Sequence, residues 1–199
     1  MFKLIPNSFI AFLIYSFCSF LMLILVSNSV YANALESSPT TQNMNDLLKQ
    51  QKFIPIGETT FTVLFWDVYT SKLLTTSGKY PIIKKNDSLL FNINYLKKIN
   101  SDDLIERTIE QWQHLGITKE KYQNYLPVLK QIWPNINEGD RLSLLIYQGR
   151  SIFYFNEQYL GVINEVEFGE MFLAIWLSDE TSQPSLRNEL LGNTSRESE

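Results

Sequence analysis

Residues 141–163, RLSLLIYQGRSIFYFNEQYLGVI, contain the pattern that decides the fold class. Apolar and polar side chains alternate in the first part of this stretch, and short apolar segments recur twice more. The breaks between the segments are Gln148-Gly149 and Asn156-Glu157. Two-residue connections join antiparallel neighbours, whereas parallel strands need a crossover of about a dozen residues or more. The stretch therefore predicts a three-stranded antiparallel meander.

Helical patterns lie on both sides of this meander. Residues 101–115 and 118–133 repeat apolar side chains at helical spacing, and Pro127 is expected to kink or split the second helix. Residues 166–177 predict an apolar helix. Residues 181–192 predict a last helix with a proline near its first turn.

Strand-like segments lie near the start of the domain. Residues 53–74 are rich in β-branched and aromatic side chains, and Gly57-Glu58 is expected to form a turn or a bulge. Residues 64–66 are consecutively apolar, which is typical of a strand covered on both faces. Residues 89–95 alternate between apolar and polar side chains. Strands, helices, strands and helices in this order indicate an α+β fold, with one antiparallel sheet and helices packed on it.

The N-terminal residues predict export. Lys3 is the only charged residue among residues 1–34, residues 8–26 are uncharged and mostly apolar, and residues 32–34, Ala-Asn-Ala, fit a cleavage site. We expect residues 1–34 to be a signal peptide and the domain to be periplasmic or otherwise exported. The apolar stretch also approaches the roughly 20 residues that span a bilayer. An anchor in the inner membrane formed by residues 8–26 therefore stays open as the alternative.

The remaining chain is predicted to hold one domain. We expect a linker and short helix at residues 35–52, the domain at residues 53–192 and a disordered tail at residues 193–199. This length suits a single domain that buries a core without a covalent staple. Cys18 is the only cysteine and lies in the predicted signal peptide, so the exported domain has no disulfide.

The charged residues exclude several classes of function. The chain has 17 basic and 21 acidic residues and no basic run, so nucleic-acid binding is not expected. His114 is the only histidine, and any catalytic triad or histidine zinc site would have to use it. Its place beyond the apolar stripe of its helix favours a surface histidine. Phosphate-binding, dinucleotide-binding and H-E-x-x-H motifs do not occur, and neither a cofactor nor a metal is expected.

Several short motifs occur in the order and spacing of a known family. They are residues 57–58, 65–69, 138–142, 154–157, 160–161, 172–177, 181–184 and 186–187. Over residues 53–192 the chain resembles the secreted bacterial group of the chalcone isomerase-like family. The resemblance implies a curved antiparallel sheet with helices packed on one face and a cleft between them. Plant relatives close a chalcone into a flavanone in that cleft, and other members of the fold bind fatty acids without known chemistry.

The polar residues of the plant enzymes cannot be carried over to this chain. The position of the family's strand threonine falls on Leu64, and Ile175 lies near the expected position of a second polar residue. Neither side chain can donate a hydrogen bond to a phenolate or enolate oxygen. We therefore expect a non-catalytic domain, with no catalytic residues, that binds a small apolar ligand such as a fatty acid. Two alternatives stay open: an intramolecular lyase or isomerase of the chalcone isomerase type, and a structural partner in an envelope complex.

Seven residues are candidates for ligand binding. They are Arg107, Tyr69, Asp67, Trp66, Tyr95, Trp112 and Trp176. An arginine on the shoulder of a helix can reach into a cleft and bind a carboxylate with its fork of donors. The alternative for Arg107 is a surface ion pair with Glu110 or Glu106.

The other candidates also have structural alternatives. Asp67 could be a structural hydrogen-bonding residue, with Arg141 or a backbone N–H as its partner. The tryptophans could belong to the core, where they would still line any apolar cavity. Membrane contact is expected only through the N-terminal segment, if that segment is not cleaved. The sequence leaves the oligomeric state open.

Overall fold

The computed structural model describes residues 44–82 and 86–193. The predicted signal peptide or anchor, the spacer up to residue 43 and residues 194–199 of the predicted tail lie outside the described residues. Within the described part, no helix is both long enough and apolar enough to cross a membrane.

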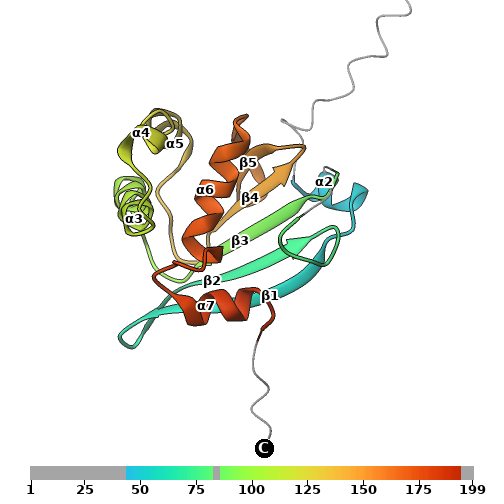
Figure 1. The fold of residues 1–199 in the computed structure, drawn as a ribbon, viewed down its shortest axis with the longest axis horizontal. Coiled ribbons are helices and arrows are strands. Elements are labelled where there is room, and N and C mark those ends of the chain that lie inside the picture. The colour runs from blue at the N-terminus through green and yellow to red at the C-terminus, as the bar shows by residue number, and fades with distance from the viewer. Residues whose placement is uncertain (1–43, 83–85, 194–199) are drawn as a thin grey trace, which may run out of the picture. The chain divides into compact units, whose positions relative to one another are not determined.

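The described residues form one sheet in which the strand order follows the chain order. Its strands are β1 (Ile54–Val63), β2 (Trp66–Thr75), β3 (Leu89–Tyr95), β4 (Arg141–Tyr147), β5 (Arg150–Phe155) and β6 (Gln158–Ile163). Every neighbouring pair is antiparallel. The predicted antiparallel sheet is therefore confirmed, and β4, β5 and β6 are the predicted meander (Figure 1).

The two turns of the meander have the backbone conformation that tight hairpins favour. Gln148 and Gly149 have φ values of 52° and 76°, and Asn156 and Glu157 have values of 46° and 72°. Positive φ at both central residues is typical of type I′ turns, whose twist matches that of the flanking strands. The Asn156 side chain also accepts a hydrogen bond from the Arg141 backbone N–H at 2.8 Å, which ties this turn to the start of β4.

The helices occupy the predicted segments. They are α2 (Met44–Gln50), α3 (Ser101–His114), α4 (Lys119–Tyr122), α5 (Leu126–Ile132), α6 (Val166–Leu177) and α7 (Pro184–Leu190). Pro127 lies in the first turn of α5, so the predicted split of the helix at residues 118–133 is confirmed. Pro184 begins α7, where its missing N–H leaves no intrahelical bond unmade.

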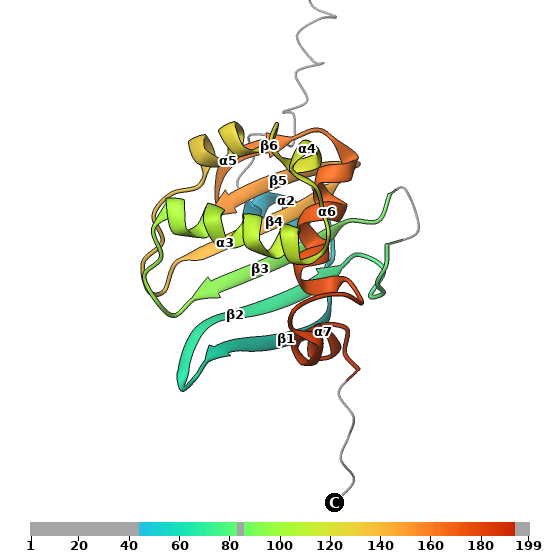
Figure 2. The same ribbon diagram turned by 60° about the vertical axis from the view of Figure 1, so that its left-hand side comes forward.

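The main core lies between the sheet and α3 and α6. Alternate side chains of the strands point toward these helices, because successive side chains of a strand point to opposite faces. Leu73, Phe91 and Phe153 from the sheet pack with Trp112 of α3 and Phe168 of α6, and all five are 0% exposed. Figure 2 shows α3, α6 and α7 in front of the same face of the sheet.

A second cluster lies on the opposite face of the sheet, beneath α2. Its buried members are Met44, Leu47, Leu90, Leu145, Ile152 and Tyr154. The resemblance implied helices on one face, and α3 to α7 fit that expectation. The short helix predicted before the first strand adds cover on the other face, so the centre of the sheet is buried on both sides.

The prediction for residues 64–66 is wrong. Instead of a strand covered on both faces, Leu64 and Phe65 form the turn between β1 and β2, and Trp66 begins β2. The exposed fractions of Leu64, Phe65 and Trp66 are 85%, 94% and 65%. Three consecutive apolar residues gave no turn signal in the sequence, because glycine, proline, asparagine and aspartate are all absent from them. The turn extends beyond the helix layer in both views (Figures 1 and 2).

The edge strand β1 is covered by α7. The register of β1 against β2 shifts between Pro55 and Gly57, so the predicted bulge is confirmed. A Cβ atom at position 57 would lie 2.1 Å from the carbonyl oxygen of Glu189. Only glycine permits this approach, and it brings the fully buried Leu190 against the sheet.

Candidate ligand-binding site

Three of the predicted ligand-binding residues lie together beneath the C-terminal half of α6. The indole Nε1 of Trp176 donates a hydrogen bond to the hydroxyl of Tyr69 at 3.0 Å. The rings of Tyr69 and Tyr95 meet edge to face with centroids 6.1 Å apart. Phe91 packs against Trp176 at 4.8 Å, and Phe61 stacks on Tyr69 at 5.1 Å. Three of the seven candidates thus lie in contact with one another or with shared neighbours, and their role in ligand binding stays a prediction.

Burial sets the protonation of these tyrosines. Desolvation raises the pKa of Tyr69 to about 12, although the hydrogen bond from Trp176 opposes this shift. The pKa of Tyr95, which is 3% exposed, is also raised, first by desolvation and then by the nearby Tyr69. Both phenols are therefore neutral at physiological pH, and neither is a general base there.

Trp112 belongs to the core on the α3 side of α6. Its Nε1 donates a hydrogen bond to the carbonyl oxygen of Met171 at 3.1 Å, and its ring stacks on Tyr122 at 5.3 Å. The side chain is fully buried. Trp112 thus links α3 to α6 through a hydrogen bond and is a core residue, as the alternative interpretation of the tryptophans predicted.

Closely packed rings fill the layer between Trp112 and the sheet. Phe168 stacks on Phe172 at 5.8 Å, and Phe153 meets both rings edge to face at 6.0 and 5.7 Å. Trp133 meets Phe153 edge to face at 5.7 Å and contacts Phe172 at 5.8 Å. These distances are those of aromatic pairs in contact. A ligand bound here would have to displace side chains of the core.

Trp66 and Asp67 lie apart from this group, at the start of β2. The carboxylate of Asp67 accepts a hydrogen bond from Thr62 Oγ1 at 2.6 Å. Asp67 is therefore a hydrogen-bonding residue at the start of the strand, as the structural alternative held. Its partner is Thr62 and not Arg141, because the Arg141 side chain donates to Asn94 at 2.8 Å. Trp66 is largely exposed and lies under the ammonium group of Lys97, 5.1 Å from the ring centroid.

Arg107 lies on the exposed side of α3. Its guanidinium binds the carboxylate of Glu110 at 2.7 Å, and 73% of the Arg107 side chain is exposed. This is the ion pair given as the alternative. To bind a ligand carboxylate, Arg107 would first have to leave Glu110. His114, at the end of the same helix, is exposed as expected.

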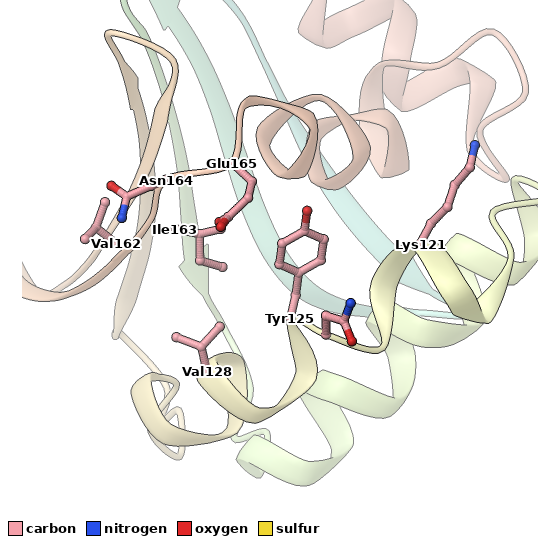
Figure 3. A pocket seen from close by; sticks show the side chains of 8 residues that line it. Lys121, Tyr125, Val128, Val162, Ile163, Asn164 and Glu165 are labelled. Atoms are coloured by element: carbon pink, nitrogen blue, oxygen red, sulfur yellow. The ribbon is translucent and has the colours of Figure 1, made fainter.

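An open pocket lies between the α4–α5 segment and the connection from β6 to α6. Its volume is about 420 Å³. The residues that line it are Lys121, Asn124, Tyr125, Val128, Val162, Ile163, Asn164 and Glu165. In Figure 3, Val128 and Ile163 approach each other from opposite walls, and the ring of Tyr125 stands between α5 and the turn that holds Glu165. The pocket is therefore lined by both apolar and polar side chains.

The lining of the pocket carries charges of both signs. In Figure 3 the Lys121 side chain extends away from the other lining residues, whereas the carboxylate of Glu165 lies beside Ile163. The pKa of Tyr125 is raised by desolvation and then by the charges of Glu165 and Glu167. Tyr125 also meets the core ring of Phe168 at 5.0 Å, so one side chain separates the pocket from the packed layer.

Sequence reasoning did not find this pocket. It placed Tyr125 in the apolar stripe of a helix, as a core residue. A single sequence does not show that residues 121–128 face residues 162–165. The two segments are far apart in the chain and meet only when the sheet and helices have packed together. Among the described residues, no group of three or more histidine, cysteine, aspartate or glutamate side chains could hold a metal ion.

Known proteins with this arrangement of sheet and helices identify the class. The model of the chalcone isomerase-like family matches residues 57–192. An uncharacterized protein of Haemophilus influenzae is 25% identical over 140 residues, which cover 70% of this chain and 68% of that protein. The crystal structure of a fatty-acid binding protein of Arabidopsis thaliana superposes with a TM-score of 0.53 at 12% identity, covering 71% of this chain and 87% of that one.

The fold and the matched span together define the class as an open antiparallel sheet with chalcone isomerase-like topology. The chain belongs to the chalcone isomerase-like family. The resemblance seen in the sequence is therefore confirmed, as is the predicted α+β fold.

Proposed function

We propose that this chain is an exported, non-catalytic binding domain for a small apolar molecule with one anionic end, such as a fatty acid. The observation that carries the proposal is the pocket beside α5. Its volume of about 420 Å³ falls within the range of small-molecule sites, about 300–1,000 Å³. The lining side chains Val128, Val162 and Ile163 can contact an acyl chain, and the Arabidopsis structure of similar fold belongs to a fatty-acid binding protein.

The charged side chains of the lining determine which polar group of a ligand fits the pocket. Lys121 is a lining residue whose side chain extends outward in Figure 3, and it offers three donors and a positive charge to a ligand that reaches it. A carboxylate beside it gains a charge-assisted hydrogen bond, which is about twice as strong as a neutral one. Glu165 in the same lining disfavours a second anionic group, so a monocarboxylate fits better than a dicarboxylate.

The placement of Leu64 and Ile175 supports a binding role rather than chalcone cyclisation. Leu64 lies at the exposed end of a hairpin, and Ile175 is 8% exposed within the core. Neither position presents a hydrogen-bond donor to a buried substrate. The apolar stretch at residues 8–26 and the Ala-Asn-Ala at residues 32–34 support export.

Calorimetric titration of the exported protein with dodecanoic acid and with dodecanol tests this function. We expect the acid to bind more tightly than the alcohol, and Lys121→Glu to abolish that preference. Lys119→Glu is the matched control, because Lys119 lies on the same short helix but does not line the pocket. Equal loss in both variants, or turnover of a chalcone by the wild-type protein, would contradict the proposal.

A further inference from the structure

The turn between β1 and β2 is an apolar surface feature that ligand binding does not explain. We name residues 63–66, Val-Leu-Phe-Trp, the apolar tip; their exposed fractions range from 46% to 94%. The other large apolar side chains exposed in the described residues, Ile54 and Val166, are single and less exposed than Leu64, Phe65 or Trp66. Isolated exposed apolar residues are ordinary, whereas a contiguous group marks an interaction site.

The backbone of the apolar tip adds to this evidence. Leu64 has a φ of 58°, and it is the only residue of the tip with positive φ. A two-residue hairpin turn with positive φ at its first central position is of type II′, and that position strongly favours glycine. A leucine there strains the turn and exposes a large apolar side chain. Neither property helps the domain fold, so both indicate a role outside it.

The surroundings of the apolar tip are those of a membrane-interface element. Lys97 lies over the Trp66 ring, and Lys98 follows it in the chain with an exposed side chain. Tryptophan is enriched at the level of lipid headgroups, and lysine beside it can reach anionic phosphates. Asp67 and Thr62 bind each other directly behind the tip. This polar pair limits insertion to the three outermost side chains.

We propose that the apolar tip inserts into the headgroup and upper acyl region of a bilayer that contains anionic lipids. A turn that exposes apolar side chains at its convex end fits a bilayer, which accepts such a shape without a complementary groove. A protein partner would need a matching concave pocket. The two lysines favour an anionic surface over a neutral one.

The chain outside the described residues permits this contact. If residues 8–26 stay in the membrane, the length of residues 27–43, which we call the tether, is at most about 60 Å. A domain of this size has a radius of gyration of about 15 Å. The tether is therefore long enough for any side of the domain to reach the bilayer. If the signal is cleaved, the tip alone supplies a weak, reversible attachment.

Quenching of tryptophan fluorescence by brominated lipids tests the proposal in the full-length chain. The chain is reconstituted into vesicles of phosphatidylcholine and phosphatidylglycerol, with and without bromine on the acyl chains. Trp112 and Trp133 are 0% and 3% exposed, and Trp176 is held by Tyr69, so the quenching is expected to come from Trp66. We expect quenching in the wild-type protein and its loss in Trp66→Phe.

A second variant separates insertion from folding. Leu64→Gly with Phe65→Ser removes the two most exposed apolar side chains and relieves the positive φ, so we expect a higher melting temperature together with loss of Trp66 quenching. Val166→Ser, which removes an exposed apolar side chain elsewhere, should keep wild-type quenching. Equal quenching in the double variant and the wild type would overturn the proposal. So would unquenched Trp66 whose emission shifts with protein concentration, because a second copy would then cover the tip.

Discussion

The ring layer beneath α6 and the pocket beside α5 are neighbours that differ in how completely their side chains fill the space. In the ring layer, Phe153, Phe168 and Phe172 are almost completely buried and in mutual contact. In the pocket, Val128 and Tyr125 are only partly buried and face open volume. If the proposed function is correct, the residues that stabilise the domain and those that bind the ligand lie in separate places. A ligand in the pocket would then leave the aromatic packing undisturbed.

The largest expected effect comes from removing the ring that the two regions share. Phe168 touches Tyr125 of the pocket as well as the rings of the core. We expect Phe168→Ala to lower the free energy of unfolding by about 3–5 kcal/mol, as measured by urea denaturation. The new cavity would join the pocket, so the variant should prefer longer fatty acids than the wild type.

Val128→Ala is the matched control for this change. Val128 lines the pocket and is only partly buried, so its truncation should lower the free energy of unfolding by less than about 1 kcal/mol. If Phe168→Ala lowers the free energy of unfolding by no more than Val128→Ala does, the ring layer does not contribute more to stability than the pocket.

An intermediate effect is expected at the hydrogen bond between Trp176 and Tyr69. Tyr69→Phe keeps the ring but leaves the indole N–H of Trp176 without its acceptor. We expect a loss of about 1–2 kcal/mol in the free energy of unfolding at pH 7, with unchanged fatty-acid affinity. A large fall in affinity would show that this part of the core takes part in binding.

The same variant changes the alkaline stability. Tyr69 titrates near pH 12 in the folded protein and near pH 10 when unfolded, so the unfolded state loses its proton first. The contribution of Tyr69 to the free energy of unfolding is therefore fully present below pH 10. It falls between pH 10 and 12, by up to about 1.4 kcal/mol per pH unit. Tyr69→Phe should make this decline shallower in chemical denaturation at each pH. Equal slopes would show that Tyr69 is not protected from ionisation.

The smallest expected effect on stability comes from filling the pocket. Val128→Trp places an indole in open volume, so the free energy of unfolding should change by no more than about 0.5 kcal/mol. Calorimetry should show that binding of dodecanoic acid is lost. Unchanged affinity with a filled pocket would place the ligand elsewhere in the molecule.

The sequence predicts the framework of this fold because local patterns determine most of it. Alternation and two-residue turns define the meander, and Pro127 divides a helix as its chemistry requires. Tyr69, Tyr95 and Trp176 were chosen as separate candidates, and only the fold shows that they lie together.

Two features could not be read from the sequence, for different physical reasons. The apolar tip has the composition of a buried strand, and its turn lacks the residues that usually mark one. The pocket depends on how far α5 stands from the end of β6, which is a property of tertiary packing alone. The position of Arg107 could be read only in part from the sequence. Its spacing to Glu110 permitted the ion pair but did not require it.

The packing of α2 has a consequence for the order in which the molecule is assembled. A ribosome makes α2 before any strand, but its partners Leu145, Ile152 and Tyr154 belong to β4 and β5. The backbone hydrogen bond from the Met44 N–H to the Glu157 carbonyl oxygen likewise joins residues that are far apart in the sequence. Contacts of such long range are slow to form, because the entropy of loop closure must be overcome before they contribute. The burial of α2, the first of the described elements along the chain, therefore depends on strands from the second half of the sequence.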